Sequence, residues 1–370
     1  GVQTCALPIF AVRREHRRER GLREAEDVRR LAPALRVAQQ HVGFVDGQLL
    51  ERVARDEDVA DVGVYVVGRK AQPQVVQHRA LVHVLEPDEV AGGRLEVAVR
   101  RPQLRHLLVR GIILRTRPRK IAPLYQKIWM EDGSPLRVYS KRVTENLRSI
   151  NHDIEFEFAM RYGNPSIRNG LEQLKERGVD ELLLLPMFPH YAQATTESSL
   201  KHAHKQLKVL DWSPTLLEMG HFETAEEFVV PLADSIRPHL DEDTHLLFSY
   251  HGLPVSHVKR IDRSKNHCQT VKDCCTVACD ANSLCYGHHC YKTTMAVVER
   301  LGLTPEQWSL SYQSRLGPVK WLEPSTTQMV EALVKKGVKK LAIVAPAFLA
   351  DGLETLEELD IGIQIGRAHV

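Results

Sequence analysis

The most informative stretch of the chain is Leu246-Leu247-Phe248-Ser249-Tyr250-His251-Gly252-Leu253-Pro254. An apolar run leads into a polar tripeptide, and the chain then turns at Gly252 and Pro254. This pattern predicts a buried strand whose carboxyl end presents the imidazole of His251. Ligands of open α/β sheets bind outside the carboxyl ends of the strands. An imidazole placed there accepts protons near neutral pH or binds a metal.

The sequence around this stretch alternates between strand and helix patterns. We expect strands at 155–160, 181–186, 244–249, 308–312 and 340–344. We expect helices at 121–130, 140–150, 166–177, 225–235, 294–301 and 326–336. Strands that alternate with helices of this length indicate βαβ units and parallel sheets. Two such series, divided near Asp241, predict an α/β protein with two Rossmann-like, doubly wound lobes of parallel sheet and a cleft between them.

Length and charge narrow the function classes. A chain of 370 residues exceeds one typical domain. The formal charge of +3 gives no reason to expect a nucleic-acid partner. No apolar run approaches the roughly 18 residues of a membrane span, and no clean signal peptide is visible. We therefore predict a cytoplasmic location and leave peripheral membrane contact and oligomeric state open.

The first hundred residues differ from the rest in composition. Residues 11–119 contain 21 Arg and one Lys, with no Ser and no Asn, whereas the later chain uses Lys, Ser and Asn freely. The end segments Thr4–Ile9 and Ile365–Val370 can be encoded by complementary strands of one oligonucleotide. We expect 1–9 and 365–370 to be adapter-like and 1–104 to be a non-native or frame-shifted segment. The alternative is a genuine basic N-terminal domain.

Residues capable of chemistry cluster at the ends of the predicted strands. They are Arg161, Tyr191, His251, Gln313, Arg315, Trp321, Asp351, Glu354 and Glu358. Glu354 and Glu358 are four residues apart, so on a helix both carboxylates share one face. The alternative for this pair is an ordinary acidic first turn stabilised by the helix dipole.

Aromatic and small residues at the same ends favour a flat, largely apolar ligand. Tyr191, Trp321 and the Leu316–Pro318 turn could line a slot for it, and Gly317 would let the backbone approach closely. Trp321 could equally be a core anchor beside two prolines.

Several spaced motifs, in this order, resemble the ferrochelatase family. They are Gly111–Leu114, Arg161–Pro165, Pro189–Tyr191, Phe248–Pro254, Gln313–Pro318 with Trp321-Leu322, and Phe348–Asp360. The resemblance covers about residues 105–364. It implies an N-terminal chelatase lobe at 105–241, a C-terminal lobe at 242–364, and a porphyrin cleft between them. The implied reaction is insertion of Fe²⁺ into protoporphyrin IX or coproporphyrin III in haem biosynthesis, with release of two protons.

The resemblance also assigns roles to residues. His251 and Glu354 are implied as the facing catalytic pair that also contacts the Fe²⁺ substrate, since imidazole accepts protons and N and O ligands suit ferrous iron. Glu358 and Asp351 would continue an acidic path for metal or protons. Tyr191, Trp321 and Gln313 would contact the porphyrin, and Arg161 or Arg315 would bind a propionate.

Two departures from the family pattern are visible. The family opens with a strand and a Leu-Gly-Thr-Pro-like loop that this chain lacks, and its members continue beyond Asp360. We therefore expect both lobes to be incomplete, the first lacking its opening strand and the second truncated. A missing strand leaves a sheet edge open.

A dense cysteine segment lies at 267–290. It holds Cys268, Cys274, Cys275, Cys279, Cys285 and Cys290, six of the seven cysteines in the chain. Such density in a cytoplasmic protein favours a metal or an iron–sulfur cluster over disulfides. Some bacterial ferrochelatases resemble this segment and hold a [2Fe–2S] cluster there. The expected ligands are Cys268, Cys274 or Cys275, Cys285 and Cys290. Structural zinc and a metal-free reduced loop are the alternatives.

Two other functions are alternatives to iron insertion. One is a chelatase for another metal or tetrapyrrole. The other is a binding module, in which the cysteine segment senses iron or redox state and the cleft merely holds haem. The pair His251 and Glu354 favours an enzyme, because a carrier needs no proton acceptor opposite a carboxylate.

Overall fold

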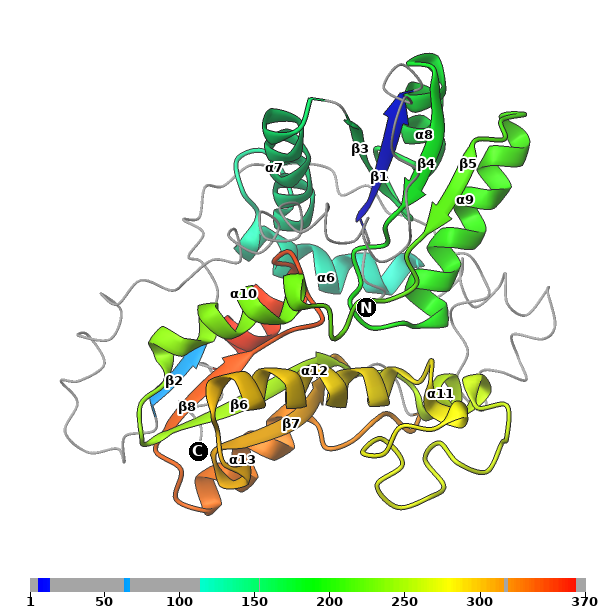
Figure 1. Ribbon diagram of the computed structural model, residues 1–370. Coiled ribbons are helices and arrows are strands. Elements are labelled where there is room, and N and C mark those ends of the chain that lie inside the picture. Colours follow the sequence, from blue (N-terminus) through cyan, green and yellow to red (C-terminus); the bar gives the residue numbers. More distant parts are fainter. Residues whose placement is uncertain (1–5, 14–62, 67–113, 153, 316–318, 364–370) are drawn as a thin grey trace.

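The structure is a computed structural model that describes residues 6–13, 63–66, 114–152, 154–315 and 319–363. It contains two four-stranded sheets, ordered β3-β1-β4-β5 and β2-β8-β6-β7. Each sheet forms the centre of one lobe, and helix α6 (Leu114–Ile128) crosses between them (Figure 1). The predicted motif at 111–113, the turn 316–318 and the tail 365–370 lie outside the described residues.

The first lobe carries helices on both faces of its sheet. Its elements are α7 (Pro135–Ile150), β3 (Ile154–Met160), α8 (Ile167–Glu176), β4 (Val179–Leu184), α9 (Ser198–Val209) and β5 (Thr215–Glu218). Helix α8 begins where predicted, because the hydroxyl of Ser166 accepts a hydrogen bond from the Asn169 amide at 3.2 Å. Apolar residues of α8 and α9 pack with β4 on one face. Leu147 of α7 and Phe156 of β3 belong to the main core on the other face.

The predicted open sheet edge is filled in the structure. Strand β1 (Ala6–Arg13) lies between β3 and β4 and runs antiparallel to both, so this sheet is not wholly parallel as expected. Strand β2 (Gly63–Val66) pairs in parallel with β8 in the second sheet. Both strands come from the segment 1–104. The assignment of that segment as non-native, and of the lobe limits, stays a prediction.

The second lobe is doubly wound around a parallel sheet. Its strands are β6 (Thr244–His251), β7 (Trp308–Gln313) and β8 (Lys340–Val344). Every residue of β6 is buried. Phe248 and Tyr250 pack toward α10 (Glu226–Ile236) and α12 (Tyr286–Leu301), whereas Leu247 packs toward α13 (Thr326–Lys335). A strand covered on both faces explains the continuous apolar run Leu246-Leu247-Phe248.

Several boundaries differ from the predicted ones. Helix α12 begins at Tyr286, two turns before the expected residue 294, because its first turns are built from Gly, His and Cys rather than a clear apolar stripe. Helix α9, strand β5 and the short helix α11 (Val255–Ile261) were not predicted. Helix α10 precedes the predicted division near Asp241, yet it packs on the second sheet.

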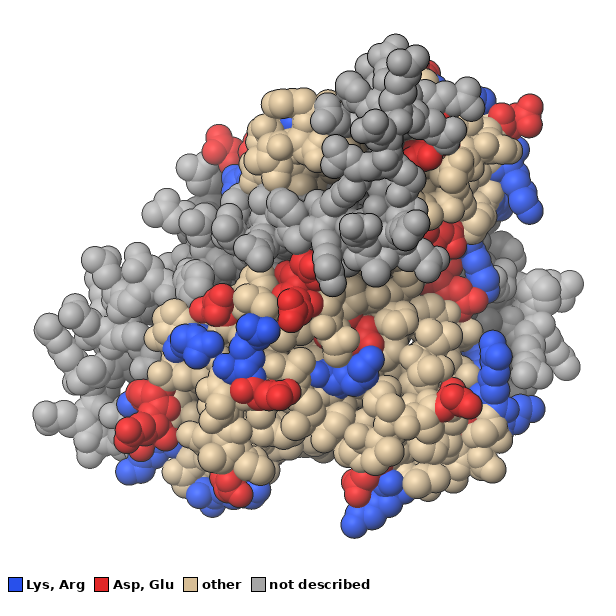
Figure 2. All heavy atoms as spheres, in the orientation of Figure 1, with Lys and Arg blue, Asp and Glu red and all other residues tan. Residues whose placement is uncertain are grey.

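The surface and the helices give two further observations. On the face shown in Figure 2, acidic and basic side chains are interspersed among the described residues, as the formal charge of +3 leads one to expect. None of the described helices combines the length and apolar character needed to cross a membrane.

Candidate active site

His251 is the last residue of β6 and is only 8% exposed. Its Nδ1 lies 2.7 Å from the carbonyl oxygen of Gly252. A carbonyl oxygen only accepts, so Nδ1 carries the proton and Nε2 is the basic nitrogen of the ring. The ring centroid lies 6.1 Å from that of Phe348. The strand end therefore presents an oriented imidazole, as the sequence predicted.

A tight backbone contact follows His251. The Gly252 amide donates to the Gln313 carbonyl at 2.7 Å, and a Cβ at Gly252 would lie 2.7 Å from that same oxygen. Leu322 N–H donates to the Leu253 carbonyl at 2.9 Å, and Pro254 pairs with Trp321 in an antiparallel bridge. The turn after His251 thus packs against the segment that carries Trp321.

Gly252→Ala is expected to destabilise the fold by roughly 1–3 kcal/mol, because the new Cβ overlaps a backbone oxygen that cannot rotate away. The free energy of unfolding, measured by urea titration, tests this expectation. Gly220→Ala is the matched control, because a Cβ there meets nothing within 4 Å. Equal effects of the two substitutions would contradict the predicted close approach.

Gln313 links the strand of His251 to the helix of Glu354. It pairs in register with His251 on the neighbouring strand. Its side-chain Oε1 accepts from the Ser249 hydroxyl at 2.5 Å, and its Nε2 donates to the backbone carbonyl of Glu354 at 2.8 Å. The sequence assigned Gln313 to porphyrin contact, but both ends of its amide are bonded within the protein.

Glu354 and Glu358 lie on the π-helix η9 (Leu353–Ile361) rather than on the expected α-helix. Glu354 is half-buried, and burial raises the pKa of its carboxyl. The two oxygens of Glu358 accept from the backbone amide and the hydroxyl of Ser314, each at 2.6 Å. Glu358 is therefore fastened to the loop after β7, while Glu354 occupies the first turn of the helix.

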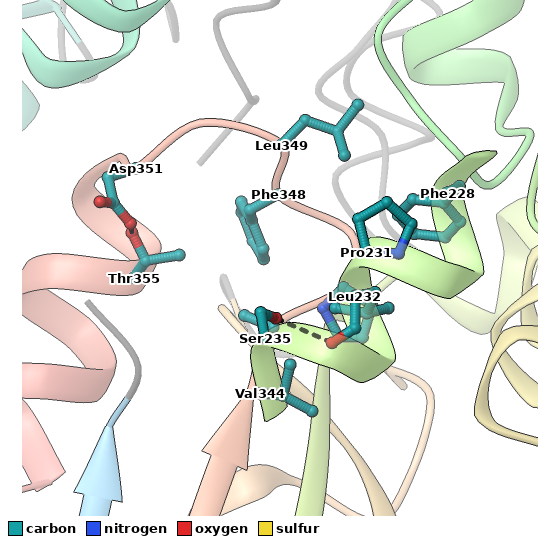
Figure 3. Close-up of a pocket in the computed structure, with 11 residues that line it drawn as sticks. Phe228, Pro231, Leu232, Ser235, Val344, Phe348, Leu349, Asp351 and Thr355 are labelled. Carbon is teal, nitrogen blue, oxygen red and sulfur yellow. Dashed lines mark hydrogen bonds between the residues drawn. The ribbon is translucent and has the colours of Figure 1, made fainter. Parts of the chain in front are cut away.

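A small cavity lies beside this helix (Figure 3). It has a volume of ≈ 40 Å³, and its lining includes Phe228, Leu232, Phe348, Asp351 and Thr355. A water molecule needs about 10–15 Å³ of such space, so the cavity has room for a few waters and is too small for a macrocycle. The side chains of Asp351 and Thr355 lie on the helix side of the cavity.

Asp351 is a buried carboxyl with a raised pKa. It is 5% exposed, and its Oδ1 accepts from the Thr355 hydroxyl at 3.0 Å. Its Oδ2 has no hydrogen-bond partner among the described residues. Burial raises the pKa of this carboxyl from 3.8 to about 6. Asp351 therefore exchanges a proton close to neutral pH.

Asp351→Asn is expected to stabilise the protein most at pH 8 and by roughly half as much at pH 5. A raised pKa in the folded state stabilises folding at pH below 3.8, and this contribution is lost as the pH rises through about 6. Above that range the buried carboxylate costs roughly 3 kcal/mol, which the neutral amide avoids. Melting temperatures at both pH values test this expectation. An equal shift at pH 5 and pH 8 would contradict the titration.

The other predicted porphyrin contacts lie farther apart. Arg161 Nε donates to the Ser198 hydroxyl at 3.0 Å, and its guanidinium lies 4.4 Å from the ring centroid of Tyr162. The Tyr191 hydroxyl donates to Glu197 Oε2 at 3.2 Å. Burial, followed by the charge of Glu197, raises the pKa of Tyr191 to about 12.

Arg315 is exposed and lies on the second lobe. Its Nη2 is 3.4 Å from the Leu322 carbonyl and 3.8 Å from Glu323 Oε1. Arg161 and Tyr191 are thus both anchored at the start of α9 in the first lobe, and Arg315 beside Trp321 in the second. No described contact joins the two groups.

Four of the cysteines are neighbours, although no three of their sulfur atoms all lie within 4.8 Å of one another. The Cys274 and Cys275 sulfurs lie 3.9 Å apart, and the Cys285 thiol interacts with those of Cys268 and Cys275. The bond from the Cys275 thiol, together with backbone amides at the start of α12, lowers the pKa of Cys285 to about 6. We call Cys268, Cys274, Cys275 and Cys285 the thiol cluster.

The two remaining cysteines of the segment lie outside the thiol cluster. Cys290 is fully buried one turn along α12, beside Tyr286, and burial raises its pKa. Cys279 is exposed, with its sulfur 3.4 Å from His267 Nε2. The sequence left the choice among five thiols open, and Cys290 differs from the other four in interacting with the Tyr286 hydroxyl.

One group of polar side chains, at the contact between the lobes, was not predicted from the sequence. Ligand atoms of His221, Glu223 and His289 lie within 4.8 Å of one another. Among the described residues, no other three His, Cys, Asp or Glu side chains bring their ligand atoms this close together. His221 Nδ1 lies 2.6 Å from Glu223 Oε2, and Lys292 Nζ lies 2.6 Å from Oε1. Burial lowers the pKa of His289 to about 4, so this ring is neutral. His289 appears in the sequence only as one more polar residue among the cysteines.

Two α/β lobes, with an oriented imidazole and a half-buried carboxyl on elements joined through Gln313, match the architecture expected of a two-lobed metal chelatase. Residues 96–366 match the family model described as Ferrochelatase. A ferrochelatase of Pseudomonas fluorescens (strain Pf0-1) is 40% identical over 69% of this chain and 75% of its own length. One from Bdellovibrio bacteriovorus is 40% identical over 70% of this chain and 78% of its own length.

The chain belongs to the ferrochelatase family, the lyases that insert ferrous iron into a porphyrin in haem biosynthesis. The predicted family, fold class and enzyme class are thereby confirmed. The alternatives of a different chelatase and of a mere binding module are not supported by these matches.

Proposed function

We propose that this chain inserts Fe²⁺ into protoporphyrin IX or coproporphyrin III, with His251 and Glu354 as the catalytic pair. The observation that carries the assignment is Gln313, which pairs with His251 and bonds the first turn of the helix bearing Glu354. This arrangement fixes both groups to one rigid strand end. Enzymes position acid–base groups in this way before the reaction begins.

The proposed chemistry follows from the two side chains. Two pyrrole N–H protons must leave the macrocycle as Fe²⁺ enters. His251 Nε2 accepts a proton, because Nδ1 is held as a donor by Gly252. Glu354 stabilises the incoming cation, and its raised pKa allows it to take a proton.

The neighbouring carboxyls complete the site. Asp351 and Glu358 continue the acidic path away from Glu354, as the sequence suggested. Ser314 supports Glu358 through two hydrogen bonds, and Asp351 titrates near neutral pH. Trp321 packs on the porphyrin beside the His251 turn. Tyr191 and Arg161 or Arg315 contact the macrocycle and its propionates.

The test is consumption of porphyrin fluorescence when Fe²⁺ is added anaerobically to the purified protein. Protoporphyrin IX and coproporphyrin III are compared by kcat/KM, and the preferred substrate has the higher value. Retention of both fluorescences after iron addition, in a protein that binds porphyrin, would overturn the proposal.

We further propose that the thiol cluster holds a [2Fe–2S] cluster. Tetrahedral metal sites with metal–sulfur bonds of about 2.3 Å place two thiolates roughly 3.8 Å apart, and Cys274 and Cys275 sulfurs lie 3.9 Å apart. The Gln269 amide lies 3.2 Å from the Cys274 sulfur, and a lowered pKa favours the Cys285 thiolate. When bound, such a cluster supplies a one-electron redox couple. Structural zinc is the alternative occupant.

Cys285→Ser is expected to abolish the visible absorbance and the bound iron and sulfide of anaerobically purified protein. It removes the thiol that interacts with those of both Cys268 and Cys275. Cys279→Ser is the matched control, because Cys279 is exposed and lies outside the thiol cluster. A colourless wild-type protein with stoichiometric zinc would favour the zinc alternative instead.

The remaining assignments extend the sequence predictions. We propose a cytoplasmic location with possible peripheral membrane contact, and a porphyrin site shared by the lobes 105–241 and 242–364. Cell fractionation tests the cytoplasmic location. Limited proteolysis around residue 241, with and without porphyrin, tests the shared porphyrin site, which predicts slower cleavage when porphyrin is bound.

A further inference from the structure

His289 joins three parts of the molecule. It lies in the first turn of α12 with no solvent exposure. Its Nε2 lies 2.8 Å from the Ser283 carbonyl, in the cysteine segment. Its Nδ1 lies 3.2 Å from the Tyr191 amide, in the first lobe. A carbonyl only accepts and an amide only donates, so the proton sits on Nε2 and the ring spans both partners as one tautomer.

The same hydrogen bonds argue against a metal ion at the trio of His221, Glu223 and His289. A metal bound at His289 Nε2 would require that nitrogen to lose the proton it donates to Ser283. In addition, the Lys292 ammonium already pairs with Glu223 at 2.6 Å and occupies the place of a cation. The side chains of His221 and Glu223 therefore surround His289 with polar contacts, and we call these two the clamp residues.

On one side, His289 is fixed to the segment of the thiol cluster. Its amide donates to the Cys285 carbonyl at 2.9 Å. The neighbouring His288 donates from Nδ1 to the Cys275 carbonyl at 2.7 Å. Asn282, next to Ser283, donates its side-chain amide to the Cys274 carbonyl at 2.9 Å. The backbone of the thiol cluster and the first turn of α12 thus form one hydrogen-bonded unit.

On the other side, α12 holds the loop that ends in Tyr191. His190 Nε2 lies 2.9 Å from the Thr293 hydroxyl, which donates to the Glu223 carbonyl at 2.7 Å. Tyr191 N–H is bonded directly to His289. This loop follows β4 and is the part of the first lobe assigned to porphyrin contact.

We propose that His289 is a positioning residue that couples occupancy of the thiol cluster to the order of the Pro189–Tyr191 loop, so that a loaded cluster tightens porphyrin binding. This inference rests on the proposed cluster and on the proposed porphyrin site. Segment 262–285 has little regular structure, so a bound cluster supplies much of its order. Without the cluster, the Ser283 turn and the His289 bridge loosen together. Loss of a hydrogen bond that contributes about 1 kcal/mol to the binding free energy corresponds to a roughly fivefold change in porphyrin affinity.

The experiment measures the dissociation constant of protoporphyrin by fluorescence, without iron addition, for cluster-loaded and cluster-free protein. Wild type is expected to bind about fivefold more tightly when loaded. His289→Ala is expected to bind equally in both forms. If His289 had a purely structural role, its loss would weaken porphyrin binding by both forms. The ratio of their dissociation constants would then stay unchanged. Hydrogen exchange of residues 186–198 is expected to slow on loading in the wild type only.

His221→Ala is the matched control, because it removes a clamp residue and leaves both His289 bonds in place. It is expected to keep the fivefold ratio. His289→Gln, which cannot span both partners, serves if the alanine variant does not fold. A loaded wild type without tighter binding, or a His289 variant that keeps the ratio, overturns the coupling. A protein that retains no iron and sulfide overturns the cluster assignment itself, which absorbance and metal analysis reveal separately.

Discussion

His251→Ala is expected to lower kcat for iron insertion by about 10²–10⁴-fold while porphyrin still binds. The substitution removes the Nε2 that accepts a pyrrole proton, and it leaves the strand intact. Stopped-flow loss of porphyrin fluorescence after Fe²⁺ addition measures the rate, and fluorescence titration without iron measures the binding. Normal iron insertion by this variant would show that another group accepts the protons.

His245→Ala is the matched control for that experiment. His245 lies on the same strand at its amino end and is also 8% exposed. Its Nε2 lies 2.9 Å from the Ser309 hydroxyl, so its loss removes this partly buried hydrogen bond. The control therefore carries a similar stability cost, and we expect it to retain kcat. A comparable loss of rate in both variants would indicate strand damage instead of lost chemistry.

Glu354→Gln is expected to lower kcat by about 10²–10³-fold, because the neutral amide neither stabilises the incoming cation nor takes a proton. The backbone bond from Gln313 to residue 354 is retained, so the π-helix stays in place. The rate is measured over a range of Fe²⁺ concentrations, which separates kcat from KM for the metal.

Glu357→Gln is the control on the same helix. Glu357 pairs with Lys127 of α6 at 3.2 Å, across an exposed contact that contributes little. We expect less than a threefold change in rate, in the range of such weak pairs. If Glu354→Gln retains a rate within that range, the carboxylate opposite His251 is not Glu354.

Local pattern was enough to predict much of the second lobe. β6 is a fully buried strand because the apolar residues before His251 are continuous, and β8 starts and ends where expected. The position of His251 at the strand end follows from the Gly252 turn. These features depend on neighbours in the chain, which the sequence displays directly.

Local pattern failed where an element is built from polar residues. The first turns of α12 contain His288, His289 and Cys290, all buried, and their burial comes from the thiol segment and the first lobe. The same limit applies to η9, whose π-helical form the sequence did not predict. In both places tertiary contacts outweigh intrinsic preference.

The family, the α/β class, the strand ends and the residue types that iron insertion needs can be read from the amino-acid sequence. How those residues are used depends on tertiary contacts. Gln313 bonds Glu354 across 41 positions of sequence, and Tyr191 bonds His289 across 98. Cys268, Cys274, Cys275 and Cys285 are neighbours in the structure although they span 17 positions of sequence, and Cys290 is buried beside Tyr286. Such pairings depend on how strands and helices pack, and no local spacing in the chain encodes them.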